Sequence, residues 1–254
     1  MRADSGWVGL LMPLHIYEEP RADGAYCYGL DPAAGQGGGD PAALIIMDAR
    51  AEPVPRQVLL FRSRNVSYRD LGLLARDLHN GGYKVVRGQT YKGIERSGGL
   101  VPEVNGANVA MMDILHDHFE DAYFFQQHSL PSLTHPEGPI RRLGFLTTGG
   151  SKTTLLDTLR EALESRAFRY SDRYLGLESM YWDRQGGKWD FKAPSVGMED
   201  FGHGDVSVAQ ALAWQGCVAV QEWIQKRAVA AMGPKQAPVS YYDWDKWKTP
   251  VGVR

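Results

Sequence analysis

Three acidic residues stand where a folded chain can bring carboxylates together. Asp31 ends the short apolar run Tyr-Cys-Tyr-Gly-Leu-Asp, Glu103 ends Gly-Leu-Val-Pro-Glu, and Asp205 opens an apolar segment rich in alanine and valine. Side chains at strand ends and at a helix start can meet at one edge of a sheet. Hard divalent cations prefer such oxygen ligands, and a pair of ions held this way supports in-line phosphoryl displacement. These three residues are therefore the candidate catalytic and metal-binding set, and the expected cofactor is a pair of Mg²⁺ or Mn²⁺ ions.

Each of the three acids also has a purely structural interpretation. Asp31 precedes Pro32 and is typical of a turn aspartate that caps its own backbone. Glu103 and Asp205 are equally typical of charges at helix N-termini. Their occurrence together, in this order of strands and helices, favours the shared site. Asp200 and His203 lie close before Asp205 and are candidates for outer positions that orient the ligands.

The charge balance limits how this chain can meet nucleic acid. The formal net charge is −2, so any contact with DNA must come from a local basic patch. Each basic side chain, taken alone, is equally an ordinary solvated residue. No groove-reading helix motif is visible, which predicts binding with little sequence preference. The candidate DNA-binding residues are Arg62, Arg64, Lys84, Arg87, Arg141, Arg142 and Lys152.

Composition is that of an ordinary globular protein of 254 residues. Cys27 and Cys217 form no CxxC pair, so neither a disulfide framework nor a zinc site is indicated, and buried thiols are expected. We find no signal peptide and no apolar run of the roughly 20 residues that span a bilayer. An intracellular protein without a membrane segment is expected.

Hydrophobic periodicity predicts a mixed α/β architecture. Its clearest helix starts at Ser67, a candidate N-cap with Asp70 three residues later, and continues with Leu71, Leu74, Ala75 and Leu78 at helical spacing. Three runs suggest an antiparallel meander, and strands alternating with helices follow. This order is that of a ribonuclease H/integrase-like fold, with a central mixed sheet (antiparallel meander, then parallel strands) flanked by helices. We expect an irregular N-terminal arm at 1–24, an RNase H-like body at 25–232 and a tail at 233–254. The predicted strands are 26–31, 42–48, 57–62, 100–103, 121–126 and 189–192; the predicted helices are 67–80, 106–119, 151–166, 174–184 and 204–231; residues 83–98 are predicted as a loop or small hairpin.

Two glycine-rich stretches imitate nucleotide-binding motifs without satisfying them. The stretch at 35–40 lies between hairpin strands, with no helix after it to receive a pyrophosphate. The stretch at 144–153 lacks the glycine that directly precedes a P-loop lysine. No ATPase is therefore expected in this chain. A serine hydrolase is not supported either, because the G-x-S-x-G elbow is missing.

Four motifs, in order, resemble the nuclease domain of tailed-bacteriophage large terminases. They are residues 16–35 with 39–43, Pro-Glu-Val-Asn-Gly at 102–106, Gly-Phe-Leu-Thr-Thr at 144–148 with Lys152, and His-Gly-Asp-Val at 203–206. The resemblance covers roughly residues 16–225. Two features depart from it: Gly204 stands where the family often has the first acid of a pair, and the basic stretch 83–98 looks like added length.

The resemblance implies a metal-dependent endonuclease that cleaves concatemeric double-stranded viral DNA during genome packaging. It also implies partners, namely the terminase ATPase domain, the small terminase and the portal protein, and a place in the host cell cytoplasm. Because no ATPase motor is seen here, an excised or separately encoded nuclease domain is expected. The alternatives are another RNase H-like DNA-processing enzyme (transposase, integrase or junction resolvase) and a non-catalytic module that docks on a portal or capsid protein, its acids serving as caps.

Overall fold

The computed structural model describes residues 14–33, 40–88, 90–91, 94–95, 98–104, 108–128, 141–192 and 204–232. For residues 90–91, 94–95, 128, 141–142 and 229–232 the description covers the backbone alone. Most of the predicted arm, the whole tail, Asp200 and His203 lie outside these ranges. Among the helices that are described, none has the length and hydropathy needed to cross a membrane.

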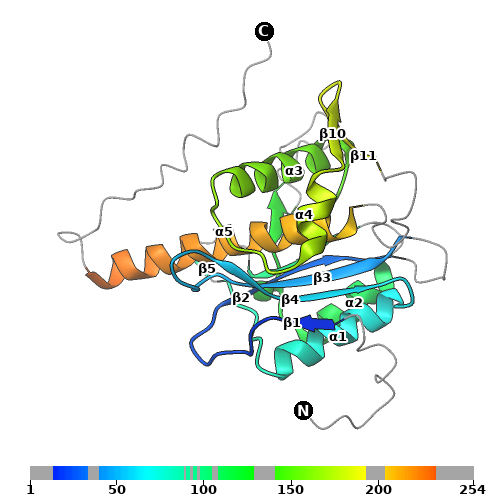
Figure 1. Ribbon diagram of the computed structural model, residues 1–254. Helices are drawn as coiled ribbons and strands as arrows, with labels where there is room; N and C mark the ends of the chain where they lie inside the picture. The colour runs from blue at the N-terminus through cyan, green and yellow to red at the C-terminus, as the bar shows by residue number, and fades with distance from the viewer. Residues whose placement is uncertain are drawn as a thin grey trace, which may run out of the picture.

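A five-stranded mixed sheet forms the centre of the molecule (Figure 1). All neighbouring pairs are antiparallel except the last, in which the two strands run parallel. This confirms the predicted fold class and the three-stranded meander. The strand order is β1 (Leu14–Ile16), β4 (Arg56–Ser63), β3 (Ala42–Asp48), β2 (Tyr26–Asp31) and β7 (Leu100–Pro102). The expectation of an irregular arm over 1–24 is wrong at 14–16, because β1 pairs with residues 59–61 of β4.

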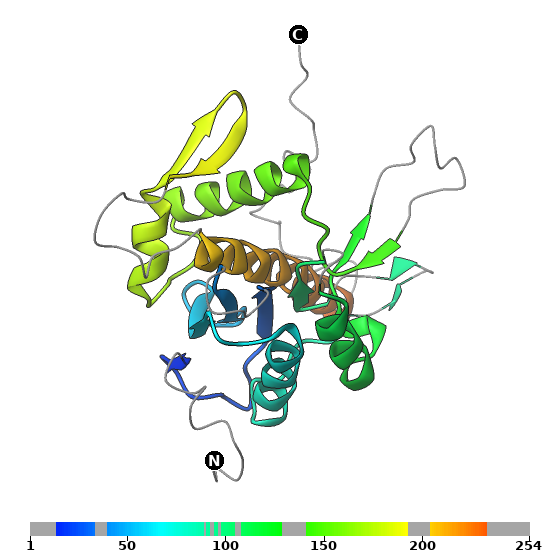
Figure 2. The same ribbon diagram turned by 90° about the vertical axis from the view of Figure 1, so that its right-hand side faces the viewer.

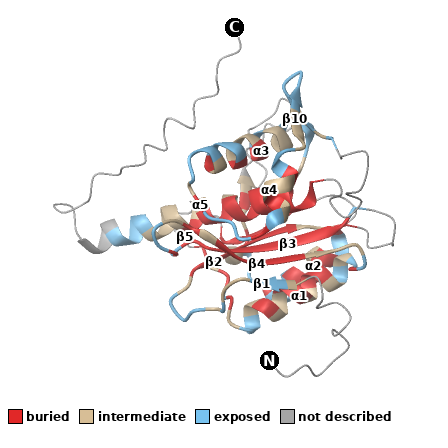
Figure 3. Ribbon diagram, viewed as in Figure 1, coloured by how far each residue is buried: buried red, intermediate tan, exposed pale blue. Residues whose placement is uncertain are grey.

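Helices cover both faces of this sheet, as Figures 1 and 2 show. On one face, α1 (Tyr68–Asn80) and α2 (Val109–His118) pack over a core that includes Leu30 and Leu44. On the other, α5 (Asp205–Met232) crosses the sheet over Cys27 and Ile45. Farther out on that face lie α3 (Gly149–Glu164) and α4 (Arg173–Ser179). With both faces covered, the central strands are buried along nearly their whole length (Figure 3).

The start of α1 shows how directly the sequence specifies a local element. Ser67 is the predicted N-cap, and its side chain accepts a hydrogen bond from the Asp70 amide. Leu71, Leu74 and Leu78 follow at helical spacing and are buried against the sheet. The predicted capping and the predicted apolar face are both confirmed.

Two predicted elements differ from the observed ones. The helix expected over 174–184 ends at Ser179, and an antiparallel hairpin follows, formed by β10 (Trp182–Gln185) and β11 (Lys188–Phe191). Its turn residues Gly186 and Gly187 have φ of 58° and 81°, a conformation that suits glycine and closes two-residue hairpins.

The first half of the strand expected over 121–126 is instead a 3-10 turn, η1 (Asp121–Tyr123). Phe124 then bridges Leu100 in parallel fashion, which extends the sheet beyond β7. Short antiparallel pairs complete the described part: β8 (Gln126–His128) with β9 (Arg141–Leu143), and β5 (Thr90–Tyr91) with β6 (Ile94–Glu95). The last pair realises the small hairpin that was one of the two expectations for 83–98.

Candidate metal centre

The register of the parallel strands β2 and β7 brings Asp31 and Glu103 to the same sheet edge. Tyr28 lies opposite Leu100 and Leu30 opposite Pro102, so both strands end at the same level. The Glu103 amide donates a hydrogen bond of 2.9 Å to the carbonyl of Leu30, the residue before Asp31. Glu103 is only 7% exposed. Two of the three predicted carboxylates are therefore neighbours by strand pairing alone.

Asp205 reaches this edge because α5 lies directly against the backbone of β2. Gly29, two residues before Asp31, makes this possible: a Cβ there would be 2.0 Å from the carbonyl oxygen of Ala209 and 2.4 Å from the amide nitrogen of Ala213. No side chain separates helix from strand at this point. The first turn of α5 therefore lies over the end of β2, with Asp205 buried at 6% exposure.

The three carboxylates form one electrostatic unit. Burial raises the pKa of Asp31 well above its usual range, and the charges of Glu103 and Asp205, with a hydrogen-bonding contact to Glu103, raise it further. Lys152, in the first turn of α3, acts in the opposite direction on the same carboxyl. The predicted set thus meets in space, together with one of the predicted basic residues.

The donor chemistry of this unit suits a hard divalent cation, which would relieve the crowding of acidic groups. The side chains do not form a complete coordination site as they stand. Among the described residues, no group of three or more His, Cys, Asp or Glu side chains is placed to hold a metal ion. Asp31 and Glu103 contact each other in this state.

Gly204, directly before Asp205, occupies a position closed to larger residues. Its φ is +83°, and a Cβ on it would fall 2.4 Å from the Trp182 ring. The indole of Trp182 fills the space that an acidic side chain would need, and the Nζ of Lys152 lies 5.4 Å from the centre of that ring. The hairpin β10–β11 thus leaves no room at position 204 for the acid that the resemblance led us to look for.

Another acid, Glu178 of α4, lies beside this unit and was missed by sequence reasoning. It is fully buried, and its Oε2 accepts hydrogen bonds from the backbone amide (2.8 Å) and the hydroxyl (2.9 Å) of Ser207. Burial raises the pKa of Glu178 to about 7; the bonds from Ser207 and the charge of Arg62 oppose this, while Asp205 adds to it. No local pattern links Glu178 to Ser207, so only the tertiary structure reveals the pair.

Of the predicted basic residues, Arg62 and Arg64 lie at the same sheet edge as Lys152. Arg62 on β4 lies opposite Ala43 on β3, and Ala43 lies opposite Asp31 on β2. The three side chains therefore share one face of the sheet. Its guanidinium lies 5.5 Å from the ring centre of Tyr174 in α4. Arg64 follows the end of β4 at this edge.

Lys84 and Arg87 are not brought to the carboxylates. Val85 bridges Tyr26, at the opposite end of β2 from Asp31, and the Arg87 guanidinium forms an ion pair with Glu120. Arg141 and Arg142 lie on β9, where the description covers backbone only, and Asp200 and His203 fall outside the described residues.

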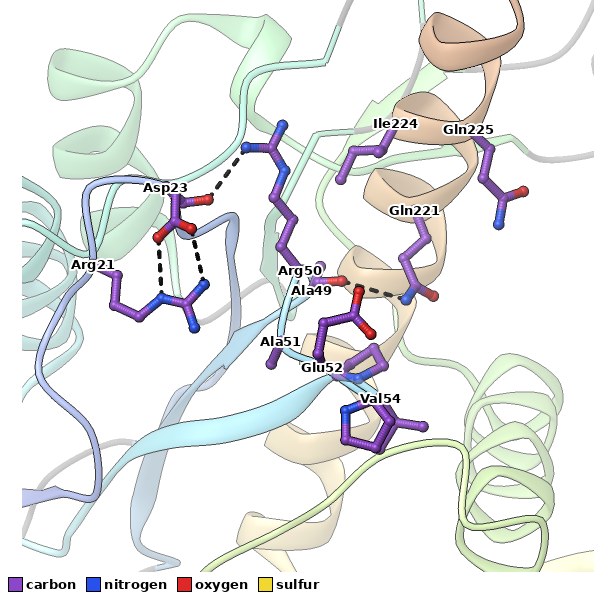
Figure 4. Close-up of a pocket in the computed structure, with 12 residues that line it drawn as sticks. Arg21, Asp23, Ala49, Arg50, Ala51, Glu52, Val54, Gln221, Ile224 and Gln225 are labelled. Carbon is purple, nitrogen blue, oxygen red and sulfur yellow. Dashed lines mark hydrogen bonds and ion pairs between the residues drawn. The ribbon is translucent and has the colours of Figure 1, made fainter.

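A hollow of about 490 Å³ lies elsewhere, between the β3–β4 connection and the later turns of α5 (Figure 4). Its charged lining is largely paired: Arg21 forms an ion pair with Asp23, and Arg50 donates to the Asp23 carbonyl. Gln221 of α5 donates to the Ala49 carbonyl there. Because Ala49 and Arg50 follow the end of β3 that pairs with Tyr26, the hollow is at the far end of the sheet from Asp31.

No family model matches the chain, and no curated protein matches it. Solved structures do. The large terminase nuclease from thermophilic phage G20c matches with bound cobalt (TM-score 0.55, 15% identity, 80% of this chain and 87% of that chain) and with bound magnesium (0.53, 16%, 80% and 87%). The nuclease domain of the Thermus phage P74-26 large terminase matches at 0.51 and 16%, over 80% and 84%. The predicted resemblance is thus confirmed at the level of fold: this chain has the RNase H-like fold of those domains.

Proposed function

We propose that this protein is a metal-dependent endonuclease of the large terminase kind, which cleaves concatemeric double-stranded viral DNA during genome packaging. One observation supports this above all: Asp31, Glu103 and Asp205 meet at one sheet edge, on a fold shared with large terminase nucleases. The acids come from two parallel strand ends and a helix start, as a phosphodiester-cleaving centre of this fold requires.

In this proposal, Asp31, Glu103 and Asp205 hold two divalent cations, Mg²⁺ or Mn²⁺. When bound, the ions activate a water nucleophile and stabilise the leaving 3′-oxygen. The chain's own contribution is to fix the three carboxylates: strand register sets Asp31 against Glu103, and the close approach of α5 at Gly29 sets Asp205. Asp200 and His203 remain candidates for residues that orient the metal ligands without binding the ions themselves.

The scissile strand is held by cations on the same edge of the sheet. Lys152 lies beside Asp31, and Arg62 and Arg64 continue the edge across β3 to β4. Phosphate contacts of this kind position the backbone and carry no base information, so cleavage has little sequence preference and falls with salt. Lys84 and Arg87 are the weakest candidates on this account, because they lie at the far end of the sheet.

The proposed role in genome packaging is supported by the likeness of this fold to terminase nuclease domains. A terminase ATPase supplies translocation, the small terminase and the portal supply register and docking, and the work takes place in the host cell cytoplasm. In the described residues, the cations at this sheet edge are Arg62, Arg64 and Lys152, and on this proposal such partners supply the register and processivity.

The test is plasmid cleavage by the purified protein. With Mn²⁺, supercoiled DNA should be nicked and linearised, and chelation should stop this. Asp31→Asn should abolish cleavage while keeping the circular dichroism of the folded protein, whereas Asp113→Asn, an exposed acid on α2, should cleave as the wild type does. Full cleavage by Asp31→Asn would remove the assignment. Strand joining, or preference for branched over linear duplexes, would point instead to a transposase, integrase or resolvase.

A further inference from the structure

The first turn of α5 donates hydrogen bonds to an acceptor on another helix. Ser207 is the third residue of α5, and amides in a first helical turn have no acceptor within the helix. Here the acceptor is Oε2 of Glu178, which takes both the amide (2.8 Å) and the hydroxyl (2.9 Å) of Ser207. A carboxylate in this place also complements the positive end of the helix dipole. Glu178 therefore caps α5 from another helix.

The helix that carries Glu178 is itself tied to the sheet. Just before α4, the Arg169 amide donates to the Pro55 carbonyl (2.9 Å), and the Gln57 amide donates to the Arg169 carbonyl (2.8 Å). The Ser171 amide donates to the side chain of Gln57 (3.1 Å), a fully buried residue of β4. Asp172 then caps α4 through the Leu175 amide at 2.7 Å. These hydrogen bonds tie the segment before α4 to β4, and α4 in turn carries Glu178.

We propose that Glu178 is a positioning residue that sets the place of Asp205 relative to Asp31. Ser207 is two residues from Asp205 in the same helical turn, and the sheet that anchors α4 is the one that carries Asp31 on β2. Glu178 touches neither substrate nor ions in this account and acts through Ser207. The inference rests on the proposed metal site and adds the residue that holds its third ligand.

The burial of Glu178 favours a positioning role over one in which its side chain meets solvent or substrate. Glu178 has no exposed surface, and the first ten residues of α5 are buried as well. Burying a glutamate costs free energy unless its carboxyl group is hydrogen-bonded, and Ser207 supplies both hydrogen bonds to Oε2. Outer-shell partners that orient metal ligands change metal affinity by about 10–100-fold when removed. Such an effect separates positioning from a general loss of stability.

The experiment is calorimetric titration of the full chain with Mn²⁺ alone, without DNA. We expect Glu178→Ala to weaken Mn²⁺ binding by about 10–100-fold. Glu178→Gln keeps an oxygen acceptor for Ser207 and should stay within about threefold of the wild type. Ser207→Ala, which retains the backbone bond, should fall between them and covers the case in which Glu178→Ala does not fold.

The matched control is Ser67→Ala, which removes a helix cap on α1, on the opposite face of the sheet. It should lower the melting temperature and leave Mn²⁺ affinity unchanged. If Glu178→Ala and Ser207→Ala bind Mn²⁺ as the wild type does, Glu178 has only a structural role. If Glu178→Gln binds as weakly as Glu178→Ala, the charge and not the hydrogen bond is responsible, and the inference is equally overturned. The wild type is titrated first, because its failure to bind Mn²⁺ would contradict the proposed function and not this inference.

Discussion

Gly29 and Ala209 are in direct backbone contact, with no room for a Cβ between the strand and the helix: an added Cβ on Gly29 would lie 2.0 Å from the Ala209 carbonyl oxygen. Gly29 is two residues from Asp31, and Ala209 is one turn beyond Asp205. This contact therefore sets the spacing of the two acids. Residue size at position 29 becomes a determinant of the site, although glycine itself carries no chemistry.

Gly29→Ala should push α5 off the sheet. We expect the free energy of unfolding to fall by about 3 kcal/mol or more, because overpacking against rigid backbone cannot be relieved by a rotamer change. Urea denaturation measures this. Gly150→Ala is the matched control, since nothing lies within 4 Å of a Cβ there and alanine is the better helix former; it should be neutral or slightly stabilising. Equal stability of Gly29→Ala and the wild type would disprove the close approach.

Removal of one crowded acid should stabilise the metal-free protein. Burial and the charges of Glu103 and Asp205 raise the pKa of Asp31, so ionised Asp31 disfavours the folded state. A raised folded pKa means that this penalty is absent at low pH and present at pH 8. In chelator at pH 8, Asp31→Asn should therefore gain about 1 kcal/mol, or roughly 2–4 °C in melting temperature. A lower melting temperature for Asp31→Asn would contradict the crowding.

The charge of Lys152 acts on Asp31. Loss of this lysine should weaken DNA binding and cleavage more than it lowers the stability of the fold. Lys152→Met should reduce plasmid nicking at least tenfold and flatten the salt dependence of DNA binding, because one phosphate contact is gone. Lys226→Met removes an exposed lysine that pairs with Glu222 far along α5 and should change neither. Nicking rates at several salt concentrations report both effects. Equal losses in the two variants would show that Lys152 has no special place.

His79 should make the fold acid-sensitive, independently of the site. Its Nδ1 accepts the Val85 amide at 3.0 Å, and its ring packs edge-on against Phe119 and Tyr123. Burial, with a smaller effect from Lys84, lowers the pKa of His79 to about 4 from 6.5. Because the folded pKa is the lower one, stability is present above pH 6.5 and is lost as pH falls toward 4, by about 1–2 kcal/mol at pH 5. Urea denaturation of the wild type and His79→Gln between pH 7 and pH 5 measures this; parallel curves would refute the assignment.

Much of the fold was predictable because local signals agree with it. The meander strands 26–31, 42–48 and 57–62, the capped helix at Ser67 and the long helix from 204 all have strong patterns within a few residues. The convergence of Asp31, Glu103 and Asp205 was predictable too, since strand ends and helix starts meet at one edge of such a sheet. The roles of these acids in metal binding stay predictions.

What escaped the sequence depends on contacts between distant segments. Trp182 looked like part of a helix, yet it belongs to a hairpin whose turn glycines 186 and 187 outweigh helical spacing. Glu178 gives no local hint of its partner Ser207, which lies 29 residues later. Lys84 and Arg87 were predicted as DNA contacts by charge alone; parallel pairing places them at the opposite end of β2 from Asp31, and their contact with DNA stays a prediction.

The most direct test of the metal site is the anomalous scattering of a crystal soaked in manganese. Anomalous peaks are expected in contact with carboxylate oxygens of Asp31, Glu103 and Asp205, and they should disappear in Asp31→Asn crystals soaked in the same way. Peaks found only elsewhere on the protein, with these three side chains unmoved and unliganded, would contradict the proposed metal site.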